Sequence, residues 1–410
     1  MKLIIFYLLL LTPSAFYAQD VQKIYIDPSK AYGGNVSDYF DSVEYIHLET
    51  TKESTVGDIY QMIVTDSSYV IADLDTKSIF FFSLDGKFIK RIPDQYSIFY
   101  DQSNNQIVTL KFSGDQTKLY LSYSYLSGKK KQHDAIVDIK NADLPMIRFF
   151  MTPLENDYFL SLNQHIFNDK NISPSDTCFY LSVYKNDSLY KQLAPVQKNI
   201  LRATQKISGY VPLPRVVEKG TFYFSTPFDF NLYKLNKDTA VRLYQLVFPS
   251  NRSLPKNIIE SVNDKLLDSV KNKIYTSRTM IMNIENIFFY GSKLFFKLRI
   301  PSSVLAHNTS VNEYQYNFAF DTISKKLVSV DRLTPDILSA FLPVMGETSK
   351  TRGMIPFKNH LYSYLSSLVL FTAKEATKSK NPQYPPVLQE YFKTQNRKSN
   401  PVIVKMKLKQ

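Results

Sequence analysis

Short runs of alternating apolar and polar residues recur along most of this 410-residue chain, and they constrain its fold more than any other feature. The clearest group lies in residues 59–92. Four runs there predict strands at Ile59–Val64, Tyr69–Asp73, Ile79–Leu84 and Lys87–Ile92. Asp85 and Gly86 separate the last two runs, and this pair is typical of a type I′ hairpin turn. Four antiparallel strands in roughly 35 residues match one blade of a β-propeller.

Comparable runs continue through the rest of the chain. They predict further strands at Gln106–Leu110, Leu119–Tyr125, Ala135–Ile139, Met146–Met151, Tyr158–Leu162, Cys178–Tyr184, Leu189–Leu193, Thr221–Ser225, Asn231–Leu235, Val241–Val247, Ile287–Tyr290, Lys293–Ile300, Tyr314–Asp321 and Lys326–Val330. Strands that follow one another without regular helical crossovers argue against a parallel α/β sheet. The sequence therefore predicts an all-β architecture.

Two segments have the three-four spacing of an amphipathic helix. In residues 253–275 the apolar positions recur at this spacing, with Ser253 as the predicted N-cap and Pro255 in the first turn. Pro386–Lys393 is a second, shorter helical segment. We expect such a helix to cover the β domain from a loop. No Pro-rich or Ser/Gly-rich linker divides the chain, which favours a single domain.

Aromatic residues must supply much of the core, because the chain has 29 Tyr, 29 Phe and no Trp. Hydrophobic residues at 44% exclude a disordered chain. The 11 glycines are under half the average frequency of about 7%. This scarcity argues against a glycine-rich phosphate-binding loop.

The N-terminus has the pattern of a secretory signal peptide. Lys2 precedes the apolar run Leu3–Leu11, and small residues follow up to Ala18. The run is too short to cross a membrane, which takes about 20 residues. We expect cleavage near Ala18 to remove residues 1–18, and residues 19–40 to form a lead-in to the domain. The mature chain, with no transmembrane segment, is then located in the periplasm or outside the cell.

Histidine and cysteine offer little for catalysis. Cys178 is the only cysteine, so the chain has no intramolecular disulfide and no zinc site with several cysteines. It lies in an apolar, strand-like run, which predicts a buried, unreactive thiol. No two of the five histidines lie within 30 residues of each other, and they are His47, His133, His165, His307 and His360. We therefore predict no catalytic residue, no metal site and no cofactor.

Two acidic pairs have a spacing that oxygen-liganded Ca²⁺ sites use, Asp73 with Asp75 and Asp134 with Asp138. For the first pair, a turn whose carboxylates cap backbone N–H groups is the better interpretation. The second pair flanks a short apolar strand, where solvated ends are expected. Neither fits the EF-hand pattern.

The formal net charge is +13, from 50 Lys and Arg against 37 Asp and Glu. Lysines gather at 129–131, 374–380 and 405–409, and those of the last group alternate with apolar residues. Alternation places that group on one solvated face of a strand. Positive charge attracts acidic glycans or lipid head groups at long range. The sequence has no motif that combines stacking aromatic residues with basic residues, so nucleic-acid binding is not predicted.

Three segments follow one another in a fixed order. Residues 41–92 contain a strand that ends in Leu-Glu-Thr and a Phe-rich hairpin with Asp-Gly-Lys. Residues 225–235 read STPFDFNLYKL, and residues 400–409 read NPVIVKMKLK. Together they resemble the first-blade, fourth-blade and closing segments of the six-bladed β-propeller proteins exported by Gram-negative bacteria, many from gut communities. The resemblance spans about residues 41–409, and residues 93–200 match it only as generic strands.

This resemblance implies a six-bladed β-propeller of four-stranded antiparallel blades over residues 41–410, with one inserted amphipathic helix near 253–275. Blades of roughly 60 residues exceed the ~40–45 of a minimal propeller repeat and leave room for the helix. Val43–Leu48 and Val402–Leu408 are placed to close the ring by sharing one blade. Many relatives carry a lipid-attachment cysteine after the signal, and its absence here argues against an outer-membrane anchor.

The resemblance implies a fold and little chemistry. We expect an exported, monomeric, non-catalytic propeller that binds a glycan or an envelope protein at one face of the ring. The alternative is a metal-dependent hydrolase, lactonase or lyase with its site in the central channel. No ligand-binding residue is assigned from the sequence.

Overall fold

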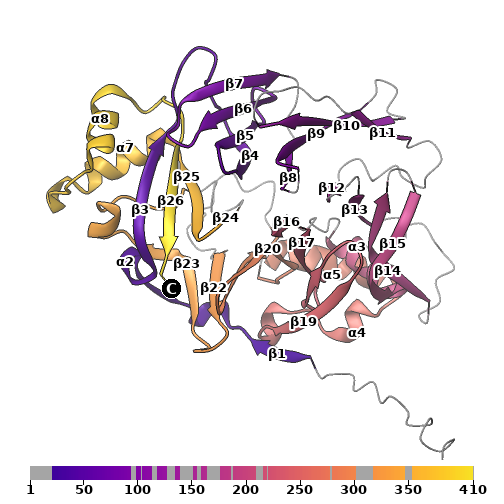
Figure 1. The fold of residues 1–410 in the computed structure, drawn as a ribbon. Helices are drawn as coiled ribbons and strands as arrows, with labels where there is room; N and C mark the ends of the chain where they lie inside the picture. The colour runs from indigo at the N-terminus through magenta and orange to yellow at the C-terminus, as the bar shows by residue number, and fades with distance from the viewer. Residues whose placement is uncertain are drawn as a thin grey trace, which may run out of the picture.

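The computed structural model describes residues 21–409, except for residues 94–97, 103, 113–117, 127–133, 139–150, 155–157, 164–175, 186–187, 209–215, 219, 278, 302–316 and 347–352. The described residues form six sheets of four or five strands. The sheets follow one another around a common centre in the order of the chain (Figure 1). The predicted signal peptide lies outside the described residues.

Each sheet is built from strands that are neighbours in sequence, apart from strands that the N-terminal segment contributes. The first sheet holds β4 (Ile59–Val64), β5 (Ser68–Asp73), β6 (Ser78–Ser83) and β7 (Phe88–Pro93), and the second holds β8 (Ile98–Asp101), β9 (Gln106–Phe112), β10 (Lys118–Tyr125) and β11 (Asp134–Asp138). The third holds β12 (Met151–Pro153), β13 (Tyr158–Leu162), β14 (Thr177–Lys185) and β15 (Ser188–Gln197). The fourth holds β16 (Val216–Glu218), β17 (Thr221–Ser225), β18 (Asn231–Leu235) and β19 (Ala240–Val247), with β1 (Gln22–Tyr25) at its edge. The fifth holds β20 (Asn283–Tyr290), β21 (Lys293–Arg299), β22 (Asn317–Asp321) and β23 (Leu327–Thr334), with β2 (Tyr32–Asn35) at its edge, and the sixth holds β24 (Ile355–Phe357), β25 (His360–Leu365), β26 (Val402–Leu408) and β3 (Phe40–His47).

Alternation of apolar and polar residues predicted most of these strands correctly. Strands β4, β13, β17, β18 and β26 have the predicted bounds, and the others that were predicted differ by a few residues at their ends. Residues 146–150 and 314–316, also predicted as strand, lie outside the described residues. Strands β1, β2, β8, β16 and β24 were not predicted, because three or four residues are too few for a visible alternation. Strand β25 was also missed.

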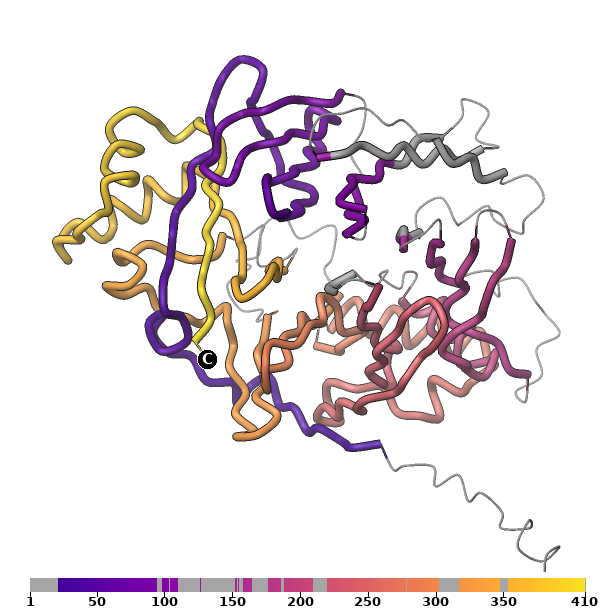
Figure 2. The backbone as a smooth tube through the Cα atoms, viewed as in Figure 1, coloured from indigo at the N-terminus to yellow at the C-terminus, as the bar shows by residue number. Residues whose placement is uncertain are grey.

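The N-terminal segment, expected only as a lead-in, adds a strand to each of two neighbouring sheets. Strand β1 pairs in parallel with β19, and β2 pairs in parallel with β23. Figure 2 shows this indigo segment passing along the outside of both sheets. It therefore covers two strand edges that would otherwise be open to pairing with another chain.

The predicted hairpin at Asp85 and Gly86 is confirmed, but the predicted type I′ turn is wrong. A type I′ turn needs positive φ at both central residues, whereas only Gly86 of this pair has positive φ, at +86°. The Gly86 N–H donates to Ser83 O over 2.9 Å, so the turn begins at Ser83. Strand β3 packs against Gly86, and the carbonyl oxygen of His47 leaves no room for a side chain there.

The helix expected near 253–275 is in fact two helices, α4 (Lys256–Ile259) and α5 (Asp264–Ser277). Ser253 is not an N-cap, since its hydroxyl lies 3.4 Å from Phe248 O. Asn263 interrupts the helical pattern, because its side-chain oxygen accepts the Leu266 N–H at 3.2 Å and starts α5 anew. Helix α8 (Pro386–Thr394) confirms the second predicted helix. Helices α2 (Val36–Tyr39), α3 (Lys198–Ser208) and α7 (Ser367–Ala376) were not predicted.

The two ends of the described chain share one sheet. Strand β26 pairs antiparallel with β3, with Val402 opposite His47, which confirms the prediction that these two segments lie together. Figure 2 shows the indigo and yellow strands side by side. Within β26, Val402, Val404 and Met406 are buried, while Lys405 and Lys407 reach solvent on the other face, as their alternation predicted.

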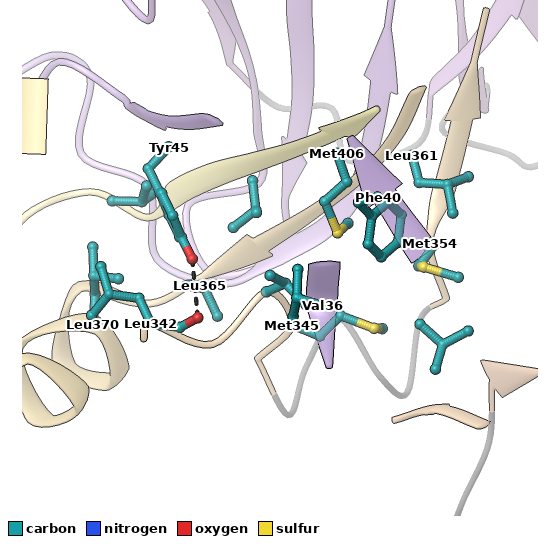
Figure 3. Close-up of a cluster of buried hydrophobic side chains, with 14 of the residues drawn as sticks. Val36, Phe40, Tyr45, Leu342, Met345, Met354, Leu361, Leu365, Leu370 and Met406 are labelled. Atoms are coloured by element: carbon teal, nitrogen blue, oxygen red, sulfur yellow. Dashed lines mark hydrogen bonds between the residues drawn. The ribbon is translucent and has the colours of Figure 1, made fainter. Parts of the chain in front are cut away.

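Apolar side chains among the described residues fill the space between most consecutive sheets. One cluster joins the fifth and sixth sheets and is closed from outside by α7, α8 and Val36 of α2 (Figure 3). Tyr45 lies at its edge, and its hydroxyl is 3.1 Å from Leu342 O. Comparable clusters lie between the sixth and first, first and second, third and fourth, and fourth and fifth sheets. Each of them contains phenylalanine or tyrosine, as the composition predicts.

Candidate ligand-binding site

The helices and long connections gather at one end of the sheets. In each antiparallel sheet, the connection from its second to its third strand and the link to the next sheet leave from the same end, while the two other turns lie at the opposite end. We call these the loop ends and the turn ends. Helix α3 links β15 to β16, α4 and α5 link β19 to β20, and α7 and α8 link β25 to β26. These five helices therefore lie at loop ends.

An ionic cluster lies near the loop end of the fifth sheet. Glu285 on β20 is opposite Lys297 on β21, and the Lys297 Nζ lies 2.8 Å from the Glu285 Oε2. The Arg299 Nη1 lies 3.4 Å from the other carboxylate oxygen. Only 15% of the Glu285 side chain and 13% of the Lys297 side chain are exposed, against 29% for Arg299. Arg299 is thus the charge of this cluster that is most open to solvent.

Amide side chains extend the cluster across the same face of the sheet. Asn317 is opposite Lys297, and its N–H and side-chain amide both donate to the Asp331 carboxylate at 2.9 Å. Asn283 is opposite Arg299, and directly opposite residues of an antiparallel pair share a face. Asn283 is only 3% exposed, yet its side-chain oxygen has no hydrogen-bond partner among the described residues.

This arrangement places positive charges, a negative charge and amide groups within one small area of the sheet, and together they supply both donors and acceptors of hydrogen bonds. A buried acceptor without a donor is costly, and native proteins supply such atoms with water or a ligand. Guanidinium, ammonium and carboxylate groups held in fixed positions select polar ligands by hydrogen bonds. Strand β20, like the other first strands of the six sheets, lies toward the common centre (Figure 1). The cluster is therefore our candidate ligand-binding site.

The segment STPFDFNLYKL, residues 225–235, contains the loop-end connection between β17 and β18 and the whole of β18. Asp229 accepts hydrogen bonds from the Thr226 hydroxyl and, at 2.7 Å, from the Asn231 side-chain amide. Burial raises the pKa of the Asp229 carboxyl. Phe228 and Phe230 both have positive φ, and Phe228 packs among α3, α4 and α5. This segment therefore attaches the helices to the fourth sheet.

The histidines are not brought together by the described structure. His47 ends β3 and His360 begins β25, and burial lowers the pKa of both imidazoles. The His47 ring packs 5.8 Å from the ring of Tyr391. His133, His165 and His307 lie outside the described residues. Across the described part of the chain, no three His, Cys, Asp or Glu side chains are grouped in a way that could hold a metal ion.

Asp73 has the capping role that the sequence indicated, whereas Cys178, predicted to be buried, is only half-buried. The buried Asp73 carboxylate accepts the N–H groups of Gly57, Asp58 and Asp75 and the Thr76 hydroxyl, so it caps a turn. The Cys178 thiol is half-buried and lies 3.5 Å from a backbone carbonyl oxygen, and burial raises its pKa to about 11. Its thiolate is scarce at neutral pH. Asp134 and Asp138 begin and end β11.

Sequence reasoning missed every member of the ionic cluster. Glu285 and Asn283 come from β20, Lys297 and Arg299 from β21, and the neighbouring Asn317 from β22, so only the strand register places them together. Alternating polar positions at the end of the predicted strand Lys293–Ile300 were the available signal, since Lys297 and Arg299 share one face.

In the described part of the chain, no helix is both long and apolar enough to span a membrane.

The chain matches several solved structures, and the first match below shows a similar fold. One is a "Putative exported protein" from Bacteroides fragilis NCTC 9343, with 14% identity and a TM-score of 0.63, covering 95% of this chain and 100% of that chain. A member of the DUF4221 family from Bacteroides vulgatus ATCC 8482 has 12% identity and a TM-score of 0.41, covering 90% and 97%. The β-propeller domain of the Trilobed protease from Pyrococcus furiosus has 7% identity and a TM-score of 0.33, covering 77% and 90%.

No curated protein matches the chain. The model of one family, described as "Domain of unknown function (DUF4934)", matches residues 23–407. Because this match spans nearly the whole chain, the protein belongs to the DUF4934 family.

Proposed function

We propose that the protein is an exported six-bladed β-propeller that binds a ligand at the loop ends of its blades. Six sheets in chain order, apolar clusters between consecutive sheets, and the pairing of β3 with β26 support a ring closed by both ends of the chain. Residues 41–410 then form the propeller. Residues 19–40 lead into it and add β1 and β2 to two blades.

Export is supported by the signal-like start of the sequence and by the similar Bacteroides fragilis protein, whose name describes export. We expect cleavage near Ala18 and release into the periplasm or the extracellular space. Mass spectrometry of protein from the native host checks this, with Gln19 as the expected first residue. Recovery of the chain with Met1 intact would contradict it.

The binding site is the cluster of Glu285, Lys297, Arg299 and Asn283. The single observation that carries this proposal is the buried Asn283 side-chain oxygen, which has no hydrogen-bond partner among the described residues and belongs to the sheet face of the ionic cluster. A glycan fits this site, because its hydroxyl groups donate to that oxygen and to carboxylates and accept from Arg299 and Lys297. We propose binding without turnover, as a monomer.

The proposal predicts that Asn283→Ala and Arg299→Ala lose glycan binding. A glycan array identifies the ligand of the wild-type protein, and calorimetry then compares the variants. We expect the dissociation constant to rise about tenfold or more for each variant, because one well-placed hydrogen bond to a charged or buried group contributes about 1.5–3 kcal/mol. Lys358→Ala, an exposed turn-end lysine paired with Asp66, is the matched control and should bind like the wild type.

A structural role for the cluster gives a different result. If Asn283→Ala lowers the melting temperature by many degrees and leaves affinity intact, the cluster serves folding only. Hydrolysis of a lactone, ester or glycan that EDTA abolishes would establish the alternative, a metal-dependent enzyme, and would contradict binding without turnover.

A further inference from the structure

We propose that the protein binds the surface of an anionic phospholipid bilayer through a helical insertion at the loop end of the sixth sheet. The insertion is residues 366–400, which join β25 to β26 and contain α7 and α8. It packs against residues 335–346, which follow β23, and every residue of both stretches is described. We call the two stretches the basic helical surface. This inference does not depend on glycan binding at the ionic cluster.

The insertion is a fixed element, because its four aromatic side chains pack on one another. The Phe371 ring centroid lies 5.7 Å from that of Tyr391 and 5.3 Å from that of Phe392, and Tyr384 lies 5.0 Å from Phe392. The Tyr391 hydroxyl donates to the Ser367 hydroxyl at 2.7 Å. Figure 1 shows both helices beyond β3 and β26, on the outer side of the sixth sheet. The insertion therefore presents its remaining faces to the surroundings.

The apolar side chains that remain exposed on this surface are aliphatic. Ile337 is 81% exposed, and Leu368 and Val387 are each 53% exposed. None of the four aromatic side chains of the insertion is exposed. Sugars bind proteins largely by packing on aromatic rings, whereas aliphatic side chains suit the acyl boundary of a bilayer. The apolar part of the surface thus favours lipid over glycan.

The charge of the surface is positive. Arg397 is bidentate to Glu375, with its Nη2 2.9 and 2.8 Å from the two carboxylate oxygens. Asp336 accepts the N–H groups of Ser37 and Leu338 at 2.8 and 3.0 Å. The full set of six basic and three acidic residues gives a net charge of +3, from Lys374, Lys378, Lys380, Lys393, Arg397 and Lys398 against Asp336, Glu375 and Glu390.

Neighbouring residues do not reverse this charge. In the adjoining loop, Glu49 pairs with Lys87 at 3.9 Å, and the charges of Lys52 and Glu53 cancel. Residues 347–352, which lie outside the described structure, contain one acidic and two basic residues in the sequence. Their own net charge is therefore +1, and the surface stays positive wherever they lie.

Two of the lysines adjoin the exposed aliphatic side chains. The Lys380 Nζ lies 5.1 Å from the ring centroid of Phe341, which follows Ile337 by one turn. Lys378 and Lys380 also precede α8, whose first turn contains Val387. Within the described structure, neither lysine forms an ion pair with a carboxylate. Cations beside exposed aliphatic side chains are typical of a surface that lies in a membrane interface.

An anionic bilayer satisfies both features at once. Its phosphate groups pair with the lysines, whose long stems let the ammonium groups reach the head groups while the aliphatic side chains enter the acyl boundary. A soluble polyanion would leave Ile337, Leu368 and Val387 in water. Binding of this kind is peripheral and needs no transmembrane segment.

The test measures partition of the mature protein onto vesicles by sedimentation. Phosphatidylcholine vesicles with about 30% phosphatidylglycerol should bind it, and pure phosphatidylcholine vesicles should not. We expect the partition coefficient to fall about tenfold or more for Lys378→Glu with Lys380→Glu combined. Ile337→Asp and Val387→Asp should each lower it several-fold, because an aliphatic side chain no longer leaves water. Raising salt to about 0.5 M should weaken binding steeply.

The absence of tryptophan from the chain allows a direct measurement of insertion. Ile337→Trp introduces a single fluorescent reporter at a position that is already exposed. Its emission should shift to the blue when vesicles with phosphatidylglycerol are added, and brominated acyl chains should quench it. A reporter that stays in water on these vesicles would contradict insertion.

A matched control lies at the opposite end of the sheets. The turn between β22 and β23 carries Ile323, which is 79% exposed, with the exposed Lys325 and Lys326. Lys325→Glu with Lys326→Glu, and Ile323→Asp, make the same changes there and should bind as the wild type does. Ile323→Trp should show no shift. Equal losses in this turn, no binding to the anionic vesicles, or equal binding to pure phosphatidylcholine would each overturn the proposal.

Discussion

Replacing Gly86 with alanine is expected to prevent folding or to lower the free energy of unfolding by about 4 kcal/mol or more. A Cβ at this position would lie 2.0 Å from the backbone oxygen of His47, and backbone cannot move aside as a flexible side chain can. The φ of +86° adds strain for any residue with a side chain. Strand β3 would have to leave the hairpin, and the Glu49 N–H would lose its 2.8 Å bond to Gly86 O. Denaturant unfolding followed by circular dichroism measures the loss.

Gly291→Ala is the matched control for this prediction. Gly291 also has positive φ, at +55°, but a Cβ there would meet no atom within 4 Å. It should cost only the left-handed penalty of about 1–2 kcal/mol. Equal losses for the two variants would show that the close approach of His47 contributes nothing.

Deleting residues 399–410 is expected to leave no folded protein. Strand β26 is the central link between β25 and β3, and Val402, Ile403, Val404 and Met406 are fully buried. Each buried side chain contributes about 1.5–3 kcal/mol, and their sum reaches the whole stability of a typical domain, about 5–15 kcal/mol. The unpaired edges of β25 and β3 should also promote aggregation. Size-exclusion chromatography and circular dichroism of the truncated chain measure both effects.

A milder variant tests the same junction in a chain of full length. Asn400 accepts the Val56 N–H at 2.8 Å and donates to Glu49 O and Ser54 O at 2.8 and 2.7 Å. Asn400→Ala leaves these buried groups unpaired and should cost about 2–4 kcal/mol. Lys405→Ala, which removes an ion pair with Glu44 near the surface, should change stability by less than about 1 kcal/mol.

For the deletion, a chain without residues 399–410 that melts within a few degrees of the full-length protein would show that β26 is dispensable.

The strands were predictable because their signal is local. Side chains of a strand alternate between two faces, so a strand of five or more residues with one buried face is visible in the sequence, as in Tyr158–Leu162 and Val402–Leu408. The pairing of the chain ends was also predictable, although it joins residues some 350 positions apart, because the resemblance to a known family supplied it.

The helical region shows where local reasoning fails. The apolar spacing in residues 253–275 is that of one helix, and of its apolar positions Leu267 is buried, whereas Val262 and Leu266 are exposed. It does not predict the break before Asp264. An Asn side chain there binds the backbone of the next turn, and packing of the short α4 against α3 decides between one helix and two.

The sequence by itself determined the β class, most strand positions, the second helix and the capping role of Asp73. Tertiary structure decided the turn at Gly86, the parallel edge pairing of β1 and β2, and the assembly of Asn283, Glu285, Arg299 and Asn317 on one face. The physical reason is the range of the interactions. Alternation and capping act between residues a few positions apart, whereas a ladder register and the close approach of two backbones depend on segments that meet only once the sheets have packed.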